Sequence, residues 1–149
     1  MSIAEFSKKI HADNRGNCAM AVAYGYARAT GKSEEEAVKA AEMFRAFGGG
    51  KAPDGLCGAL YVAKMMQPDH AESIEDVFKR GAQGFTKCKE IRTNKIIPCN
   101  RCVELEGEAL DFLRKFGNRH QSSFRKRQCK FTFVTGTEKL NFAFSSFFT

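Results

Sequence analysis

Six cysteines carry the chemistry that this sequence could perform: Cys18, Cys57, Cys88, Cys99, Cys102 and Cys129. They make up about 4% of the 149 residues, which is well below the density of a small secreted disulfide scaffold. The first residues carry charge every few positions and contain no apolar signal core, so we expect a cytoplasmic protein with reduced thiols. The expected chemistry is therefore metal binding or thiol redox exchange.

The sharpest motif is Cys99-Asn100-Arg101-Cys102, which follows Pro98 at the start of an expected helix. If Cys99 caps this helix, Cys102 lies one turn later, close enough for a disulfide or for shared metal ligation. The positive end of the helix dipole and the nearby Arg101 favour the thiolate form of these cysteines. The alternative is that both residues are small buried hydrophobes, as free cysteines often are.

Cys57 has a similar expected position. With Asp54 as the N-cap, Cys57 falls in the first turn of a helix, where the same dipole argument favours a thiolate. The preceding run Gly48–Gly50 lacks the P-loop pattern and follows no strand, so we do not expect it to bind a phosphate. It is expected to end a helix instead. Cys18 and Cys88 have no motif of their own, and each taken alone is expected in the core.

Helical periodicity runs from residue 2 to residue 116 and predicts an all-α fold, a single small bundle of five or six helices. Asp13 is the expected cap of the second helix, and Ser33 with Glu36 forms a capping box for the third. The expected segments are 3–10, 14–30, 34–47, 55–66, 73–85, 88–95 and 99–116.

The composition changes near Gly117. Residues 1–117 carry a net charge of +2, whereas residues 118–149 carry +5 and hold seven of the 14 phenylalanines. We therefore expect a helical cysteine-containing domain at 1–117 and a basic C-terminal extension at 118–149. Alternating residues around 135–137 suggest a β-hairpin in this extension, and the alternative is a disordered or adventitious tail.

The charge and the hydropathy exclude two broad classes of function. The positive charge is concentrated in the extension, and its short cluster Arg125–Arg127 is a weak signal, so nucleic-acid binding is not expected. No stretch reaches the roughly 18 apolar residues of a membrane-spanning helix, so we expect none. A redox partner protein or a small thiol is the expected partner.

Four segments together resemble a known family: NCAMAV at 17–22, FGGGKAPDGLCGALYVA at 47–63, FTKCKEIR at 85–92 and IPCNRCVELEGEAL at 97–110. They are similar to the redox-active proteins named for a C_GCAxxG_C_C cysteine pattern, which are small helical proteins of bacteria and archaea. The resemblance covers residues 13–115. It implies that Cys18, Cys57, Cys88 and one or both of Cys99 and Cys102 form a group, but it supplies no substrate.

One residue departs from the family pattern. Cys57-Gly58-Ala59 matches the start of its central box, but Val62 stands where the last glycine is expected. This change affects how closely another backbone or a cofactor can approach the helix. The tail after Gly117 and Cys129 have no counterpart in the pattern.

Three functions remain open from the sequence. The first is thiol–disulfide exchange or electron transfer, with Cys99 as the attacking thiolate, Cys102 as its resolving partner, and Cys57 and Cys88 as a second pair. The second is a zinc or iron–sulfur protein whose thiolate ligands come from Cys18, Cys57, Cys88, Cys99 and Cys102. The third is a structural or interaction protein with buried cysteines. In the first two cases, at least three cysteines should line one small pocket.

Overall fold

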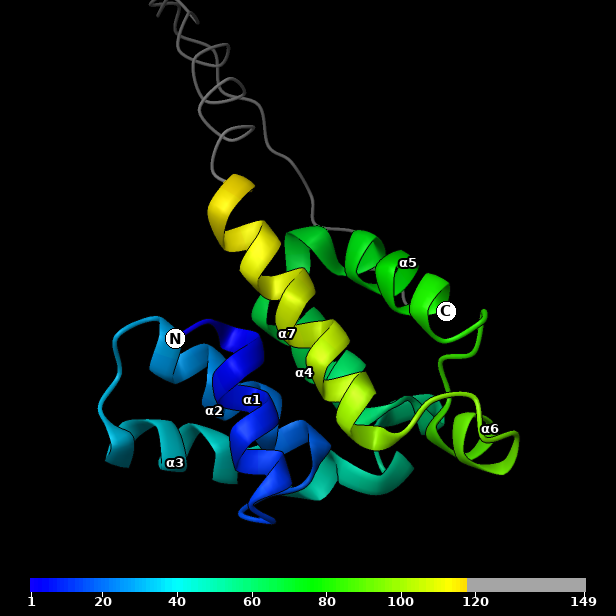
Figure 1. Ribbon diagram of the computed structural model, residues 1–149, viewed down its shortest axis with the longest axis horizontal. Coiled ribbons are helices and arrows are strands. Elements are labelled where there is room, and N and C mark those ends of the chain that lie inside the picture. Colours follow the sequence, from blue (N-terminus) through cyan, green and yellow to red (C-terminus); the bar gives the residue numbers. More distant parts are fainter. Residues whose placement is uncertain (118–149) are drawn as a thin grey trace, which may run out of the picture. The chain divides into compact units, whose positions relative to one another are not determined.

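The computed structural model describes residues 1–117, and the predicted hairpin lies outside them (Figure 1). The all-α prediction is confirmed, because the described part contains helices and a single isolated β-bridge but no strand. No helix within 1–117 is long and apolar enough to cross a membrane. The α-helices are α1 (Ile3–Ala12), α2 (Cys18–Ala29), α3 (Glu34–Glu42), α4 (Gly58–Met66), α5 (Ala71–Gly81), α6 (Cys88–Thr93) and α7 (Cys99–Phe116). Short 3-10 turns span Arg45–Gly50, Pro53–Gly55 and Pro68–His70.

The second helix, α2, is the centre of the bundle and packs against α1, α3, α4 and α7. Four of its nine buried positions are alanine and one is glycine, which lets the neighbouring backbones approach closely. At Gly25 a Cβ atom would lie 2.0 Å from the Ser7 hydroxyl and 2.7 Å from the Ile3 carbonyl oxygen, so only glycine fits. Larger apolar side chains from the other helices complete the core: Leu60, Ile74, Phe78 and Leu110.

The helix starts partly match the sequence prediction. The capping box of α3 is confirmed: the Glu36 N–H donates to the Ser33 hydroxyl at 3.2 Å, and the Ser33 N–H donates to the Glu36 carboxylate at 2.9 Å. The predicted cap Asp13 is wrong. Asn17 caps α2 instead, because its side-chain oxygen accepts the Met20 N–H at 3.1 Å.

The two cysteine motifs also sit differently from the prediction. Asp54 lies in a separate 3-10 turn, so Cys57 itself is the N-cap residue of α4. Pro98 is the N-cap residue of α7, which makes Cys99 the first residue of that helix and Cys102 the fourth. Pro53 begins the separate turn, because its fixed φ and missing N–H suit the first position of a helical turn.

Two other boundaries differ from the prediction. The third helix ends at Glu42 rather than near Phe47, and a 3-10 segment follows in which Gly49 has a φ of +67°. The fifth helix begins at Ala71 rather than at Ser73, because the turn Pro68–His70 leads directly into it. The first of these differences brings the glycine run against the start of α2.

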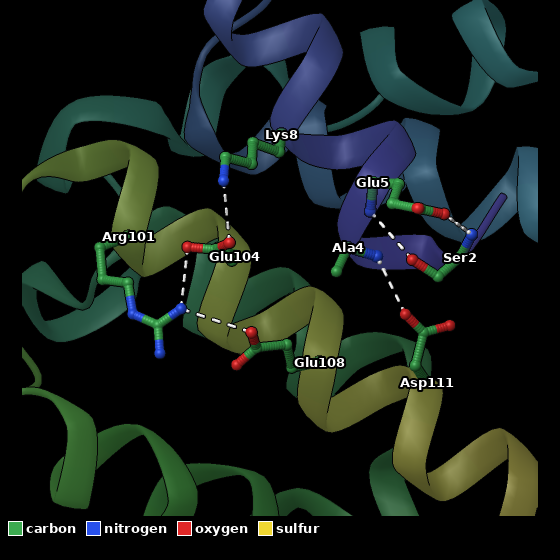
Figure 2. A network of polar contacts seen from close by, with 8 residues as sticks. All are labelled: Ser2, Ala4, Glu5, Lys8, Arg101, Glu104, Glu108 and Asp111. Carbon is green, nitrogen blue, oxygen red and sulfur yellow. Dashed lines mark hydrogen bonds and ion pairs between the residues drawn. The ribbon is translucent and has the colours of Figure 1, made fainter.

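A polar seam joins α1 to α7 (Figure 2). The carboxylate of Asp111 accepts the backbone N–H groups of Ile3 at 2.9 Å and Ala4 at 3.0 Å, so a side chain of α7 satisfies the first turn of α1. Farther along the seam, Lys8 pairs with Glu104 at 3.0 Å. The seam fixes α7 against the bundle and thereby fixes the position of its first turn.

Candidate functional site

Within residues 1–117, four helices have a cysteine at the N-cap or first position. Cys18, Cys88 and Cys99 are the first residues of α2, α6 and α7, and Cys57 is the N-cap of α4. The first turn of a helix has backbone N–H groups without intrahelical partners and a positive dipole end, and both stabilise a nearby thiolate. The fold therefore places each of these sulfur atoms in an environment that favours negative charge.

Local contacts tie these helix starts together. The Cys57 N–H donates to the Thr86 carbonyl at 2.8 Å, and Leu56 forms an antiparallel bridge with Lys87, so the segments before α4 and α6 run side by side. The amide of Asn17 donates to the Arg45 carbonyl at 2.8 Å and holds the start of α2 on the glycine run. These bonds fix the relative positions of Cys18, Cys57 and Cys88.

Close packing at Gly58 brings α4 onto the start of α2. A Cβ atom at Gly58 would lie 3.0 Å from the Cys18 sulfur and 2.6 Å from the Phe47 carbonyl oxygen. Only a glycine lets the two helix starts approach this closely. The glycine that follows Cys57 in the sequence is thus required by the geometry of the cysteines.

Four cysteines form what we call the thiol chain: Cys99, Cys18, Cys57 and Cys102, each of which shifts the thiol pKa of the next in this order. Cys99 is exposed at one end of the chain, whereas the other three are each only 3% exposed. No disulfide joins them. The thiol chain therefore runs from the surface at the start of α7 into the core.

Hydrogen bonding distributes the protons along the thiol chain. Bonds from Cys57 and then Cys99 lower the pKa of Cys18 to about 2, and the backbone N–H groups of Gly49 and Ala59 also lower it. A hydrogen bond from Cys57 likewise lowers the pKa of Cys102. Thiolates are thus favoured at the second and fourth positions of the chain.

The donors in these bonds shift in the opposite direction. Hydrogen bonding to Cys102 and to Cys18 raises the pKa of Cys57, and hydrogen bonding to Cys18 raises that of Cys99. The sequence-based prediction that Cys57 and Cys99 are the acidic thiols is therefore wrong. The helix dipole acts on them as expected, but a neighbouring sulfur accepts their proton and outweighs it.

The structure brings Cys18 into the site despite its lack of a motif. It is buried, as expected of a core cysteine, and it also contacts the partners on both sides of it in the thiol chain. The Gly49 N–H, from the glycine run, also lowers the pKa of Cys18. The signal that could have found Cys18 is its place directly after the cap Asn17.

Cys88 lies apart from the thiol chain. It is 8% exposed and borders an open cleft with Gly49, Gly50, Lys87 and Arg92. Burial raises the pKa of its thiol, and the charge of Cys18 raises it further. Cys99 borders a different hollow, beside Ile97 and Pro98. The cysteines therefore meet through the interior rather than around one surface pocket.

The thiol chain does not fit a metal ion as it stands. Within residues 1–117, no group of three or more His, Cys, Asp or Glu side chains is arranged so that it could hold one. A zinc site needs its ligands around one point, about 2.3 Å from each sulfur.

The sequence analysis missed one residue beside the thiol chain, Glu106. It is fully buried one helical turn after Cys102, and within the described residues neither of its carboxylate oxygens has a hydrogen-bond partner. Burial raises its pKa well above the usual value, and the charge of Cys102 adds to the shift. A sequence signal exists: Glu106 interrupts the apolar stripe of Cys102, Val103 and Leu110.

Comparison with protein-family models, with curated proteins and with solved structures found no match to this chain.

Proposed function

We propose that this protein carries out thiol–disulfide exchange, with exposed Cys99 as the point of contact for a disulfide of a partner protein or a small thiol compound. The observation that supports this most directly is the thiol chain, in which an exposed cysteine leads through hydrogen-bonded neighbours into the core. The resemblance to redox-active proteins with a C_GCAxxG_C_C pattern agrees with the same proposal. Reduced thiols of this kind suit the cytoplasm.

The first step uses the contact between Cys99 and Cys18. As the Cys99 sulfur attacks the substrate disulfide, its proton goes to the first substrate sulfur, which leaves as a thiol. The Cys18 thiolate then attacks the Cys99 sulfur in the mixed disulfide, and the second substrate sulfur leaves as a thiolate. The products are one reduced substrate thiol, one thiolate and a Cys18–Cys99 disulfide, so two electrons have moved from the protein to the substrate.

The second step moves the disulfide inward. The Cys57 sulfur attacks Cys18 and releases Cys99, and the Cys102 thiolate then attacks Cys57 and releases Cys18. The proton of Cys57 ends on Cys99, and the negative charge moves from Cys102 to Cys18. A disulfide between Cys57 and Cys102 therefore stores the oxidation in the core and leaves the outer pair ready for a second substrate.

This assignment changes the roles expected from the sequence. The spacing of Cys99 and Cys102 suggested that these two residues pair with each other. The hydrogen bonds support Cys18 as the partner of Cys99 and Cys57 as the partner of Cys102. Cys88, which stands apart, has no step in the proposed exchange.

Disulfide mapping tests the proposal. The full-length reduced protein is treated with a small disulfide and then analysed by peptide mass spectrometry. One equivalent should give a Cys57–Cys102 or Cys18–Cys99 disulfide, and excess oxidant should give both. Cys99→Ser should lower the exchange rate by about 100-fold or more, because the exposed nucleophile is missing, whereas Cys88→Ser, the matched control, should stay within about twofold of the wild type.

Two outcomes would contradict the proposal. One is that no disulfide forms within the thiol chain although the protein stays folded. The other is that the anaerobically purified protein contains stoichiometric zinc, or absorbs visible light as a thiolate–iron cluster does, since ligation would occupy the same sulfurs.

A further inference from the structure

Positive charge surrounds Cys99, the exposed end of the thiol chain. Cys99 borders an open hollow of about 430 Å³, and the charged residues that line this hollow are Arg92 and Lys95. The remaining lining residues are apolar: Ile91, Ile97 and Pro98. The volume lies within the range of small-molecule sites, which is about 300–1,000 Å³. The hollow therefore offers an apolar floor and two cations to a small molecule that reaches the sulfur.

More cations line the larger cleft next to this hollow. Arg92 belongs to both, and the cleft, of about 800 Å³, adds Lys87 and Lys89, with Glu90 as its only acidic lining residue in the described part of the chain. Residues 87–95 carry a net charge of +3, whereas the rest of residues 1–117 carries −1. The positive charge of the helical domain is thus concentrated on α6 and the turn that follows it.

We call these cations on and next to α6 the α6 cations: Lys87, Lys89, Arg92 and Lys95. None of them pairs with a carboxylate within residues 1–117. The seam differs, because there Lys8 and Arg101 pair with Glu104 at 3.0 and 2.8 Å (Figure 2). An unpaired exposed cation acts on charges in solution out to about 10 Å at 0.1 M salt. The α6 cations are therefore available to a ligand.

The backbone holds two of the α6 cations close to the sulfur. Only five residues join the end of α6 to the start of α7. The Ile96 N–H donates to the Ile91 carbonyl at 3.0 Å, and the Lys95 N–H donates to the Arg92 carbonyl at 3.2 Å. Arg92 and Lys95 are both exposed, so their charged ends reach solvent beside Cys99.

We propose that the substrate of the exchange reaction is a small disulfide that carries carboxylate groups, and that Arg92 and Lys95 bind these carboxylates beside Cys99. This inference rests on the proposed function and names its substrate class. A guanidinium group can hold a carboxylate through two parallel hydrogen bonds, and an ammonium group attracts one as a point charge. The covalent steps are those of the proposed exchange and need no further reactant.

The positive charge acts at two points of the reaction. Before the sulfurs react, the α6 cations raise the local concentration of an anionic disulfide and hence the rate at which it meets Cys99. When Cys18 attacks the mixed disulfide, the second substrate sulfur leaves as a thiolate, and nearby cations stabilise its negative charge. A disulfide that carries ammonium groups is repelled instead.

Exchange with small disulfides of different charge tests the inference. Dithiodiglycolate carries two carboxylates, bis(hydroxyethyl) disulfide is neutral, and cystamine carries two ammonium groups. Each is mixed with the reduced full-length protein, and mass spectrometry follows the reaction at Cys99. The readout is the ratio of the anionic rate to the neutral rate, because a change in the reactivity of the Cys99 thiol itself cancels in this ratio.

The ratio should depend on the cations of the hollow. In Arg92→Glu and in Lys95→Glu it should fall about fivefold or more, and the ratio of the cystamine rate to the neutral rate should rise. Lys39→Glu is the matched control, because it changes the net charge equally at an exposed position of α3, which lies well apart from α6 (Figure 1). This control should keep both ratios within about twofold of the wild type.

Two further measurements keep the test decisive. If Arg92→Glu does not fold, Arg92→Gln replaces it, since glutamine removes the charge without adding one. Alkylation of Cys99 needs no exchange: iodoacetate and iodoacetamide are similar in size, but only iodoacetate carries a carboxylate. The ratio of their rates at Cys99 should also fall in Arg92→Glu and stay unchanged in Lys39→Glu.

The two proposals fail on different outcomes. If no disulfide reacts with the folded wild type, the proposed function fails, and the alkylation ratio still decides whether the hollow selects anions. If exchange occurs with the same ratio in Arg92→Glu as in the wild type, the proposed function stands. The inference is then overturned, and a partner protein is left as the substrate class.

Discussion

Two faces of α7 carry the same kind of side chain in opposite states. On the face toward α1, Glu104 accepts hydrogen bonds from Arg101 and Lys8, which lower its pKa (Figure 2). Two residues later, on the buried face, Glu106 has no hydrogen-bond partner in the described residues, and burial raises its pKa. A step of two residues turns the helix by about 200°, so adjacent acids enter different environments.

The contrast separates a structural region from a chemical one. The seam acids on the outer face satisfy backbone N–H groups and cations, which positions α7. The inner face brings Cys102 and Glu106 into the bundle, where burial and neighbouring groups perturb their ionisation. The seam supplies the rigidity that holds the perturbed groups of the inner face in place.

The largest expected loss of stability comes from substituting a glycine in either region, Gly58 beside the thiol chain or Gly107 at the seam. In Gly58→Ala the new Cβ would lie 2.6 Å from the Phe47 carbonyl oxygen, and in Gly107→Ala it would lie 2.4 Å from the Ala4 Cα atom. Backbone must shift in both, so each should lower the free energy of unfolding by about 2–3 kcal/mol in chemical denaturation.

Only one of the two glycine variants should change the chemistry. Gly58→Ala moves α4 away from Cys18 and should raise the alkylation rate of that buried thiol, measured by mass spectrometry. Gly107→Ala acts at the seam and should leave this rate unchanged. Equal alkylation of Cys18 in both variants would show that the two regions are not independent.

The pH dependence of stability sharpens the comparison. Because the pKa of Glu106 is higher in the folded state, folding binds an extra proton, and this group makes the wild type less stable as the pH rises above the ordinary glutamate value of about 4.3. Glu106→Gln should therefore raise the free energy of unfolding at pH 7 by about 1–2 kcal/mol, and the gain should vanish near pH 4. Thermal unfolding of Glu106→Gln and Glu108→Gln at both values measures this, and an equal gain at both pH values would contradict it.

The smallest effects belong to the outer face. Asp111→Ala removes the acceptor for two N–H groups of α1 and should cost about 1 kcal/mol of stability. Lys8→Ala removes one ion pair whose lysine is largely exposed and should cost less than about 0.5 kcal/mol. Chemical denaturation of both variants gives these values, and a larger loss for Lys8→Ala would show that the ion pairs rather than the cap hold the seam.

Much of the fold follows from local sequence. The apolar periodicity of 2–116 predicts helices, and Ser33 with Glu36 predicts the start of α3, because both signals act within a few residues. The start of α4 was placed wrongly by three residues, and the expected cap of α7 by one. Pro53 begins a separate 3-10 turn ahead of α4, whereas Pro98 is itself the N-cap of α7.

The sequence by itself determined that this is a helical protein whose cysteines lie at or near helix starts, since helix formation and capping depend on neighbours along the chain. Only the tertiary structure decided which sulfurs touch, that Cys18 rather than Cys99 is the favoured thiolate, and that Glu106 is buried without a partner. A pKa depends on burial and on charges a few ångströms away, and residues from different helices supply both. Contacts between α2, α4 and α7 therefore set the chemistry that the spacing within each helix could not.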